Sequence, residues 1–499
     1  MRIERSCPYS LFLIVAAVAA IATFGSSLAN QASPSLSKVA PSNIIVVTNT
    51  NDSGPSSLRD ALNVANDGDT IDATGVSGTI LLTSGELQVT HSVTITGRGA
   101  GNLAINGNAT FRVFENFASN VTISGFTITD GFAADSNGGG GIFNHGGLTL
   151  SESIVGNCAT PRGSNQDGGG IFNDAGATLT LTDSTITGNG AGCAGGGIYS
   201  TNAQLTVTNS TISSNSACGC SLPLHCGGSG GGISIHGGTL EMTNSMISGN
   251  HASGGGGISS DSVMVTVTNS TISGNIGACS GGGISIGNGQ LTVISSTISG
   301  NLSGGAPGSC EQGVGGGISG YAETLTVTNS TLSGNYGSYG GGIANSGNLT
   351  VTNSTFSDNG VAIYNFEGTA QIEDSVLKVG EAGKTIVEVG GTVTSLGYNL
   401  ATDDGGGLLT GPGDQTNTDP MLGPLQDNGG STFTHALLPG SPAINAGALS
   451  FTPPPFFDQR GPGFDRVANG RIDIGSFEVQ PRPTPTPRPR PTPIPRSIS

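Results

Sequence analysis

The side chains best suited to chemistry recur at fixed offsets from a repeated glycine–isoleucine phrase. Aromatic residues follow the isoleucine by one position, and imidazole or carboxylate groups follow it by three. If equivalent positions stack, the two sets form a strip that can hold a sugar chain, because aromatic rings offer apolar faces beside polar groups. The alternative is that the repeat merely aligns ordinary surface residues. The residues of this candidate ligand-binding strip are Phe143, His145, Phe172, Asp174, Tyr199 and His236.

A reaction centre is harder to find in the repeats. Cleaving a polysaccharide by elimination needs a base and a cation, and hydrolysis needs two or three close carboxylates. Between Thr122 and Leu377 the basic residues are limited to Arg162, and the acidic residues are scattered. His145 and His236 lie three coils apart, too far for one metal ion. We therefore expect no catalytic residue, no metal site and no cofactor.

These residues belong to a repeat that starts with a glycine run and isoleucine and closes on asparagine. Alternation of apolar residues with a period of two, as at Leu205 and Val207, indicates short strands. Three short strands per ~25-residue turn, with no helix between them, stack only as coils of a solenoid. The sequence predicts an all-β fold, a right-handed parallel β-helix.

Equivalent residues of successive coils should form ladders, because each position stacks ~4.8 Å from its counterpart. Glycine runs are expected to supply tight corners, and the closing asparagine a corner with left-handed backbone. We expect one inward apolar ladder of Ile154, Ile186, Ile212, Ile247, Ile272, Ile298, Leu332 and Phe356.

Variable spacers between the closing asparagine and the next glycine run hold seven of the eight cysteines, counting Cys158. Spacers should line one edge of the solenoid, so export to an oxidising compartment would favour disulfides between adjacent coils. An odd count leaves at least one thiol free or intermolecular. The candidate pairs are Cys279 with Cys310, and Cys193 with Cys218, Cys220 or Cys226.

Composition narrows the class of protein. Only 10% of the 499 residues are charged, 86 are glycine, and the net charge of −17 makes nucleic acid an unsuitable partner. Arg2 and Arg5 precede an apolar run, Leu11 to Phe24, and small residues follow, which predicts a signal peptide cleaved after Ala29. No later run is long enough to span a membrane. The mature chain is expected outside the cell or on its surface, and its oligomeric state stays open.

Several segments resemble known families. The repeats resemble the pectin-lyase-like β-helix superfamily, and "GGGI" followed by "TISGN" is similar to the polymorphic outer membrane protein repeat. Residues 47–71 resemble the start of the domain named for a Cys-Ser-Leu-Arg-Glu-Ala (CSLREA) motif, with Ser56 and Asp60 replacing the Cys and the Glu. Residues 419–478 are similar to the choice-of-anchor Q domain. The resemblance implies a bacterial exported protein whose relatives carry surface anchors, and it implies no reaction.

We expect six segments along the chain. A short amphipathic helix near residues 57–65 should cap the first coil, and the C-terminal module should close the other end. The segments are a signal peptide (1–29), a linker (30–43), a cap with the first coils (44–120), the β-helix repeats (121–400), the choice-of-anchor Q-like module (401–480) and a Pro/Arg-rich tail (481–499).

Two functions are compatible with these features, besides a purely structural layer protein, which would require self-assembly. The first is a non-enzymatic, secreted or surface-associated protein with an adhesin-like or matrix role, whose partner would be a polysaccharide or another cell-surface glycan. The alternative is a polysaccharide lyase or glycoside hydrolase of the pectin-lyase-like fold. The scarcity of basic residues in the repeats favours the first function.

Overall fold

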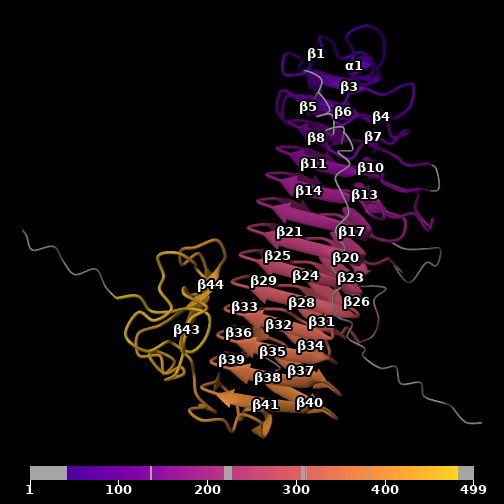
Figure 1. Cartoon of the computed structure of the whole chain (residues 1–499). Helices are drawn as coiled ribbons and strands as arrows, with labels where there is room; N and C mark the ends of the chain where they lie inside the picture. Colours follow the sequence, from indigo (N-terminus) through magenta and orange to yellow (C-terminus); the bar gives the residue numbers. More distant parts are fainter. Residues whose placement is uncertain are drawn as a thin grey trace, which may run out of the picture. The chain divides into compact units, whose positions relative to one another are not determined.

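The chain forms a right-handed parallel β-helix in which each coil contributes one strand to each of three rows (Figure 1). The computed structural model describes residues 42–481 except 135–136, 218–227, 305–309, 311 and 381–382. In one coil, β10 (Ile142–Asn144) belongs to row 1, β11 (Gly147–Ser151) to row 2 and β12 (Ile154–Gly156) to row 3. All row pairings are parallel, as the sequence predicts.

Rows 1 and 2 form one 24-stranded sheet because β17 (Ile198–Thr208) and β20 (Ile233–Thr243) run through both rows. Besides these and β10, row 1 stacks β4 (Leu87–Val89), β7 (Phe114–Asn116), β13 (Ile171–Asn173), β23 (Ile258–Asp261), β27 (Ile284–Ile286), β31 (Ile318–Gly320), β34 (Ile343–Asn345), β37 (Ile363–Phe366) and β40 (Ile386–Val389). Row 2 stacks β1 (Ile44–Val46), β2 (Thr70–Asp72), β5 (Thr94–Thr96), β8 (Val121–Ser124), β11, β14 (Thr178–Thr182), β17, β20, β24 (Val263–Thr268), β28 (Gly289–Ile294), β32 (Thr324–Thr328), β35 (Asn348–Thr352), β38 (Thr369–Glu373) and β41 (Thr392–Gly397).

Row 3 is a separate sheet of 13 strands, and the spacers add a five-stranded sheet, row 4. Row 3 stacks β3 (Gly78–Leu81), β6 (Leu103–Asn106), β9 (Thr127–Thr129), β12, β15 (Thr185–Thr187), β18 (Thr211–Ser213), β21 (Met246–Ser248), β25 (Thr271–Ser273), β29 (Thr297–Ser299), β33 (Thr331–Ser333), β36 (Thr355–Asn359), β39 (Val376–Val379) and β42 (Leu400–Ala401). Row 4 stacks β16 (Gly190–Ala191), β19 (Ser216–Ala217), β22 (His251–Gly254), β26 (Ile276–Ser280) and β30 (Leu302–Ser303).

The inward ladder of row 3 is present, with one change from the predicted register. Val155, and not Ile154, pairs with Ile186. Ile154 pairs with Thr185 and points outward, because adjacent residues of a strand face opposite sides. Ile186 to Phe356 occupy the predicted positions and are fully buried. The ladder thus buries one apolar side chain in every coil.

The predicted left-handed backbone is present at Asn157, with φ of 56°, but not at the later closing asparagines. That conformation falls on the preceding residue, such as Ser214 with φ of 57° or Gly249 with φ of 63°. The side chain of Asn250 is buried, where its Nδ2 donates to Oδ1 of Asn275 and to the carbonyl of Ile212. Burial without these bonds would be costly, so the corner turns one residue earlier and the amide points inward. The same ladder links Asn189, Asn215, Asn250, Asn275, Asn301, Asn335 and Asn359.

The glycine runs allow successive coils to approach closely. In the run that precedes β17, Gly195 has φ of +64°, which strains residues with a side chain. A Cβ on Gly196 would lie 2.5 Å from the carbonyl oxygen of Gly231 in the next coil. The run is therefore a fixed corner of the rod.

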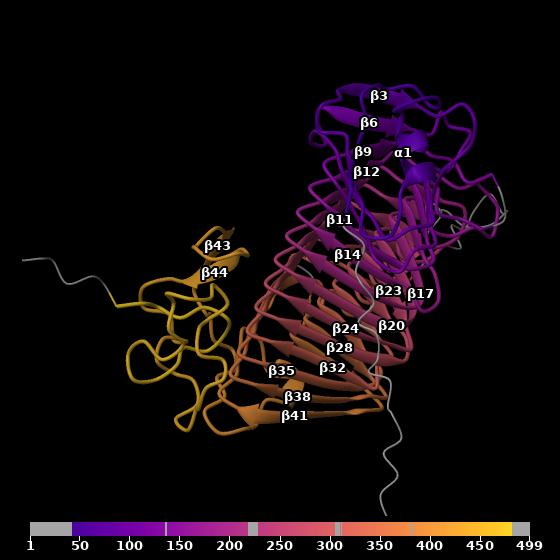
Figure 2. The same ribbon diagram turned by 45° about the horizontal axis from the view of Figure 1, so that its top comes forward.

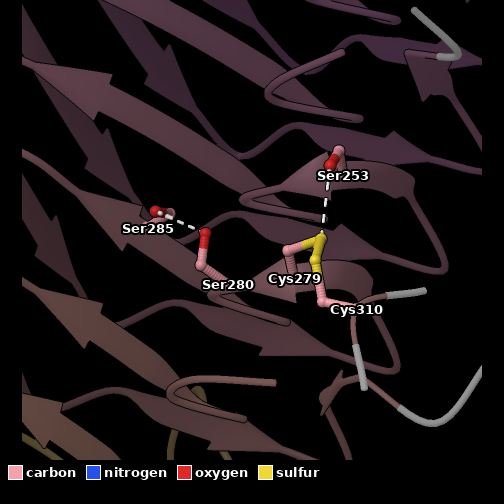
Figure 3. The surroundings of a disulfide bond; sticks show 5 residues. All are labelled: Ser253, Cys279, Ser280, Ser285 and Cys310. Carbon is pink, nitrogen blue, oxygen red and sulfur yellow. Dashed lines mark hydrogen bonds between the residues drawn. A yellow bond between two sulfur atoms is a disulfide. The ribbon is translucent and has the colours of Figure 1, made fainter. Parts of the chain in front are cut away.

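A disulfide bond joins the spacers of two adjacent coils. Cys279 and Cys310, one of the pairs considered from the sequence, are bonded, with their Cα atoms 5.0 Å apart (Figure 3). Cys193 was expected to pair with Cys218, Cys220 or Cys226. These three cysteines lie outside the described part of the chain, so that pairing stays a prediction. Cys158 is buried, and burial raises the pKa of its thiol to about 12.

A short helix, α1 (Leu58–Val64), covers the first coils, as predicted (Figures 1 and 2). Its N-cap is Ser57, whose side chain accepts a hydrogen bond from the backbone N–H of Asp60. Leu58 and Leu62 face the apolar core and are buried there. Within the described residues, no helix is both long and apolar enough to cross a membrane.

The first part of the C-terminal module covers the last coil, where Leu409 joins the solenoid core, and the rest packs beside the last coils (Figure 1). It includes the hairpin of β43 (Leu422–Gln426) and β44 (Thr434–Leu437). Its polar side chains bond to outward residues of row 3: Thr331 donates to Gln459, and Ser333 pairs with His435. Both of these row-3 side chains are buried under the module, a cover that the earlier coils lack.

Motif residues of the module hold it together. Arg460 pairs with Asp458 at 2.5 Å and lies between the rings of Phe464 and Phe477, with its Cζ 3.9 and 3.8 Å from the ring centroids. Arg466 is fully buried and donates to the side chain of Asn353. Arg460 of "DQRG" and Phe477 of "DIGSFE" therefore build the interior of the module. Gln459 and Ser476 of the same segments bond to Thr331 and Thr355 of row 3.

Candidate functional site

Row 1 carries one outward side chain per coil in a straight column. The strand register aligns Gln88, Glu115, Phe143, Phe172 and Tyr199 in five successive coils. The column therefore changes from polar to aromatic as it leaves the N-terminal coils. The candidate site lies between Glu115 and Phe143, where the polar side chains of the column give way to aromatic ones.

His145 lies between two carboxylates from the neighbouring coils. Its Nδ1 is 3.0 Å from Oδ2 of Asp174, and its Nε2 is 3.2 Å from Oε1 of Glu115. The ring stacks on Phe117 with centroids 4.9 Å apart, and the Phe143 ring lies 4.0 Å away. Each ring nitrogen thus has its own partner for exchanging a proton.

Glu115 connects this histidine to a buried arginine. Nη1 of Arg112 is 2.7 Å from Oε2 of Glu86 and 3.9 Å from Oε1 of Glu115, and its Nε and Nη2 donate to the carbonyls of Gly139 and Gly138. Burial and the hydrogen bond with Glu115 raise the pKa of Glu86, despite the opposing charge of Arg112. Glu86 therefore keeps its proton to a higher pH than an ordinary glutamic acid, which suits a general acid.

Two open cavities flank this group of five side chains, which we name the acid–base cluster: Glu86, Arg112, Glu115, His145 and Asp174. The first cavity, of about 500 Å³, is lined by Glu86 and Arg112 and also by Arg59 of the CSLREA-like segment. The second, of about 430 Å³, is lined by His145 and Asp174. Cζ of Arg112 lies 5.2 Å from the centroid of the Phe143 ring, which lines the second cavity, so the two cavities are neighbours.

The repeats between Thr122 and Leu377 did not predict this cluster, since their one basic residue is Arg162. Arg112 and Glu115 lie in the preceding coil, where Phe114 takes the place of the isoleucine and pairs with Ile142. Extending the repeat back by one coil would have found both residues.

The other predicted strip residues continue from the cluster as an unbroken series of rings. Phe143 and Phe172 have centroids 4.8 Å apart, Phe172 and Tyr199 are 5.0 Å apart, and Tyr199 and His236 are 5.8 Å apart. The structure therefore places His145 and Asp174 in direct contact, and His236 at the far end of the strip.

The described residues contain no group of three or more His, Cys, Asp or Glu side chains placed to hold a metal ion.

The comparisons with known proteins agree on the fold. The family described as "Right handed beta helix region" matches residues 196–377. No curated protein sequence matches the chain significantly. Among solved structures, the pectate lyase Pel9A is 14% identical with a TM-score of 0.37, covering 87% of this chain and 96% of its own. The PL6 family alginate lyase AlyGC is 13% identical with a TM-score of 0.48, covering 79% and 55%. A mannuronic acid specific family 6 lyase from human gut microbiota is 9% identical with a TM-score of 0.36, covering 72% and 86%.

These similarities correct the first function expected from the sequence. The solved structures that resemble the chain are named as polysaccharide lyases, the class of the alternative expected from the sequence, and not as non-enzymatic, adhesin-like or matrix proteins. At these identities the likeness shows the fold alone. An activity for this chain has to be argued from its own residues.

Proposed function

We propose that the chain is a polysaccharide lyase acting on a uronate-containing sugar chain laid across the two cavities. The observation that carries the proposal is His145, which lies between two carboxylates beside an open, aromatic cavity. Elimination requires a base to remove the proton beside the sugar carboxylate, a cation to hold that carboxylate and an acid to protonate the leaving oxygen. The acid–base cluster contains one group suited to each of these tasks.

The roles follow from the surroundings of each group. The His145–Asp174 pair faces the second cavity and would take the proton from the sugar carbon. The electrons of that C–H bond form the new double bond while the bond to the glycosidic oxygen breaks. Glu86, whose pKa is raised, would donate a proton to that oxygen. Arg59 and Arg112, both lining the first cavity, would attract the sugar carboxylate within an otherwise acidic chain.

Incubation with polygalacturonate and alginate tests the proposal. The wild-type protein should release products with the ultraviolet absorbance of an unsaturated sugar end. His145→Gln should reduce the rate about 10²-fold or more, the usual contribution of acid–base catalysis. His91→Gln is the matched control, since His91 is exposed and pairs with Asp67, outside the lining of both cavities. An equal effect of the two substitutions, or no turnover on any uronate polymer, would contradict the lyase.

A glycoside hydrolase is the second candidate, and one observation favours it. Glu86 and Glu115 are hydrogen-bonded to each other, and the pKa of Glu86 is raised, which resembles the acid and carboxylate pair of such enzymes. This activity would produce new reducing ends without the unsaturated absorbance.

We also propose that the protein is exported through its N-terminal segment, residues 1–29, and that its CSLREA-like and choice-of-anchor Q-like segments are those of a bacterial surface protein. The apolar run after Arg2 and Arg5 supports export, because signal peptides have this layout. The polysaccharides proposed as substrates are too large to enter a cell intact, so their cleavage requires an enzyme outside it. Fractionation of expressing cells, with and without residues 1–29, tests this proposal.

A further inference from the structure

The row-1 column that carries the aromatic strip passes a second aromatic site near its C-terminal end, several coils from the acid–base cluster. An open cavity of about 260 Å³ lies there, lined by Tyr321, Tyr339, Tyr364 and Phe366, with Ala344 among the other lining residues. We name this the tyrosine cavity. Nothing in the proposed cleavage reaction uses it.

The register explains why the surface is hollow at this point. Ser319, Ala344 and Tyr364 stack in the same outward column, so two small side chains are followed by a large ring. On either side, Tyr321 directly follows β31 and Phe366 is the last residue of β37. The small side chain of Ala344 in the middle coil leaves room for a cavity, and the aromatic rings around it form the cavity walls.

The tyrosine cavity is separate from the strip. The coils between Tyr199 and Ser319 carry serine in this column, and spacer side chains cover part of it. Oγ of Ser280 lies 3.4 Å from Oγ of Ser285, next to the disulfide-linked spacer (Figure 3). The column positions between the two sites are Ser234, Ser259 and Ser285.

The chemistry of the lining identifies the type of ligand. All eight lining residues are uncharged, in contrast to the two cavities at the cluster. Tyr321 is 63% exposed and Phe366 is 43% exposed, so ring faces are open to solvent. Among the described residues, the Tyr321 and Tyr364 hydroxyls have no hydrogen-bond partner, whereas the Tyr339 hydroxyl donates to Gln312. Open ring faces with unengaged hydroxyls suit a ligand that is apolar on its face and polar at its rim.

We propose that the tyrosine cavity binds a neutral sugar ring of a polysaccharide, as a second carbohydrate site on the face that carries the cleavage site. A pyranose presents C–H bonds on its faces and hydroxyls around its edge, which matches aromatic walls with phenol groups beside them. At about 260 Å³ the cavity suits a single ring rather than a long oligosaccharide. The binding requires no cleavage, so this inference stands apart from the proposed lyase activity.

Equilibrium binding tests the site directly. The chain has seven Tyr and no Trp, so its intrinsic fluorescence reports on tyrosine, and three of the seven line this cavity. Titration of the full-length protein with cellohexaose, mannohexaose, xylohexaose and an oligogalacturonate should show a saturable change with at least one neutral oligosaccharide. Tyr321→Ala should weaken that binding tenfold or more. Its exposure makes it a substitution that the fold tolerates, and Tyr364→Ala should act in the same direction.

Tyr336→Ala is the matched control, since Tyr336 is 56% exposed but does not line the cavity, and it should leave the affinity unchanged. His145→Gln should also bind normally, which separates this site from the proposed cleavage. The inference is overturned if no neutral oligosaccharide binds, if the oligogalacturonate alone binds, or if Tyr336→Ala weakens binding as much as Tyr321→Ala. A concentration-dependent dimer that Tyr321→Ala dissociates would instead make this surface a contact between two copies of the chain.

Discussion

Glu478 ionises at a very different pH in the folded chain than in the unfolded chain. Burial raises its pKa to about 8 from an ordinary value of 4.5, and the nearby Asp473 carboxylate adds to the shift. Between these two values the folded chain keeps a proton that the unfolded chain releases. The contribution of Glu478 to stability is therefore fully present below pH 4.5, declines as the pH rises and is lost above about pH 8. Burial raises the pKa of Asp374 to about 6, which acts in the same direction.

We predict that the C-terminal module loses about 2 kcal/mol of stability between pH 6.5 and 9 through Glu478 alone. Burial lowers the pKa of His435, so that group is largely neutral throughout this range. Denaturant titrations at several pH values should show the decline in the wild type and a flatter profile for Glu478→Gln. Glu323→Gln, at an exposed position, should retain the wild-type decline. A Glu478→Gln protein that declines as steeply as the wild type would contradict the assignment.

For single residues, the role that could be predicted from the sequence depends on whether the side chain is apolar or polar when it is buried. Ile186 and Ile212 were assigned correctly because an apolar position that recurs in every coil has to face inward. The roles of Asn250 and Asn275 were predicted incorrectly, because asparagine is common both at left-handed corners and in buried amide ladders. Only the position of the next coil distinguishes the two roles.

The spacers are the parts of the coils that vary most in length, and they also contain the disulfide bond. The Cys279–Cys310 bond closes a loop with a sequence separation of 31 residues. By the chain-entropy estimate, such a loop stabilises the folded state by roughly 3–4 kcal/mol. We predict a loss of this order in the Cys279→Ser, Cys310→Ser double variant, measured by denaturant unfolding. A reducing agent should lower the free energy of unfolding of the wild type and leave that of the double variant unchanged. Equal sensitivity of both proteins would contradict the prediction.

The strand order and the α1 cap were predictable because they follow from periodicity and from an amphipathic pattern. The acid–base cluster was not predicted, because it spans a coil that departs from the repeat phrase. In that coil, Phe114 replaces the isoleucine, and the charged pair of Arg112 and Glu115 flanks it. A site built from several coils depends on how they stack. Spacing within one repeat therefore does not reveal it.

At the scale of the whole solenoid, the C-terminal module acts on some coils and not on others. It buries Thr297, Thr331 and Thr355, which are outward residues of β29, β33 and β36. In a solenoid each coil is stabilised mainly by its neighbours, so losing this cover should weaken the affected coils locally. We predict that a chain ending at Thr418 exchanges amide hydrogens faster in β33 and β36, while β9 and β12 keep their protection. Uniform loss across all four strands, or no loss in any, would contradict this.

The asparagine ladder also bears on how the protein ages. Asparagine followed by glycine is prone to deamidation, because the glycine nitrogen can attack the side-chain carbonyl and release ammonia. Asn189 and Asn359 both precede glycine, yet the N–H of Gly190 donates to the carbonyl of Cys158 and that of Gly360 to the carbonyl of Asn335. Their amides are also held by the next or the previous coil. In the described structure, the pairs Asn137–Gly138 and Asn469–Gly470 have an exposed asparagine and no backbone hydrogen bond from the glycine N–H. Chemical ageing should therefore begin at these two pairs and leave the interior of the rod intact.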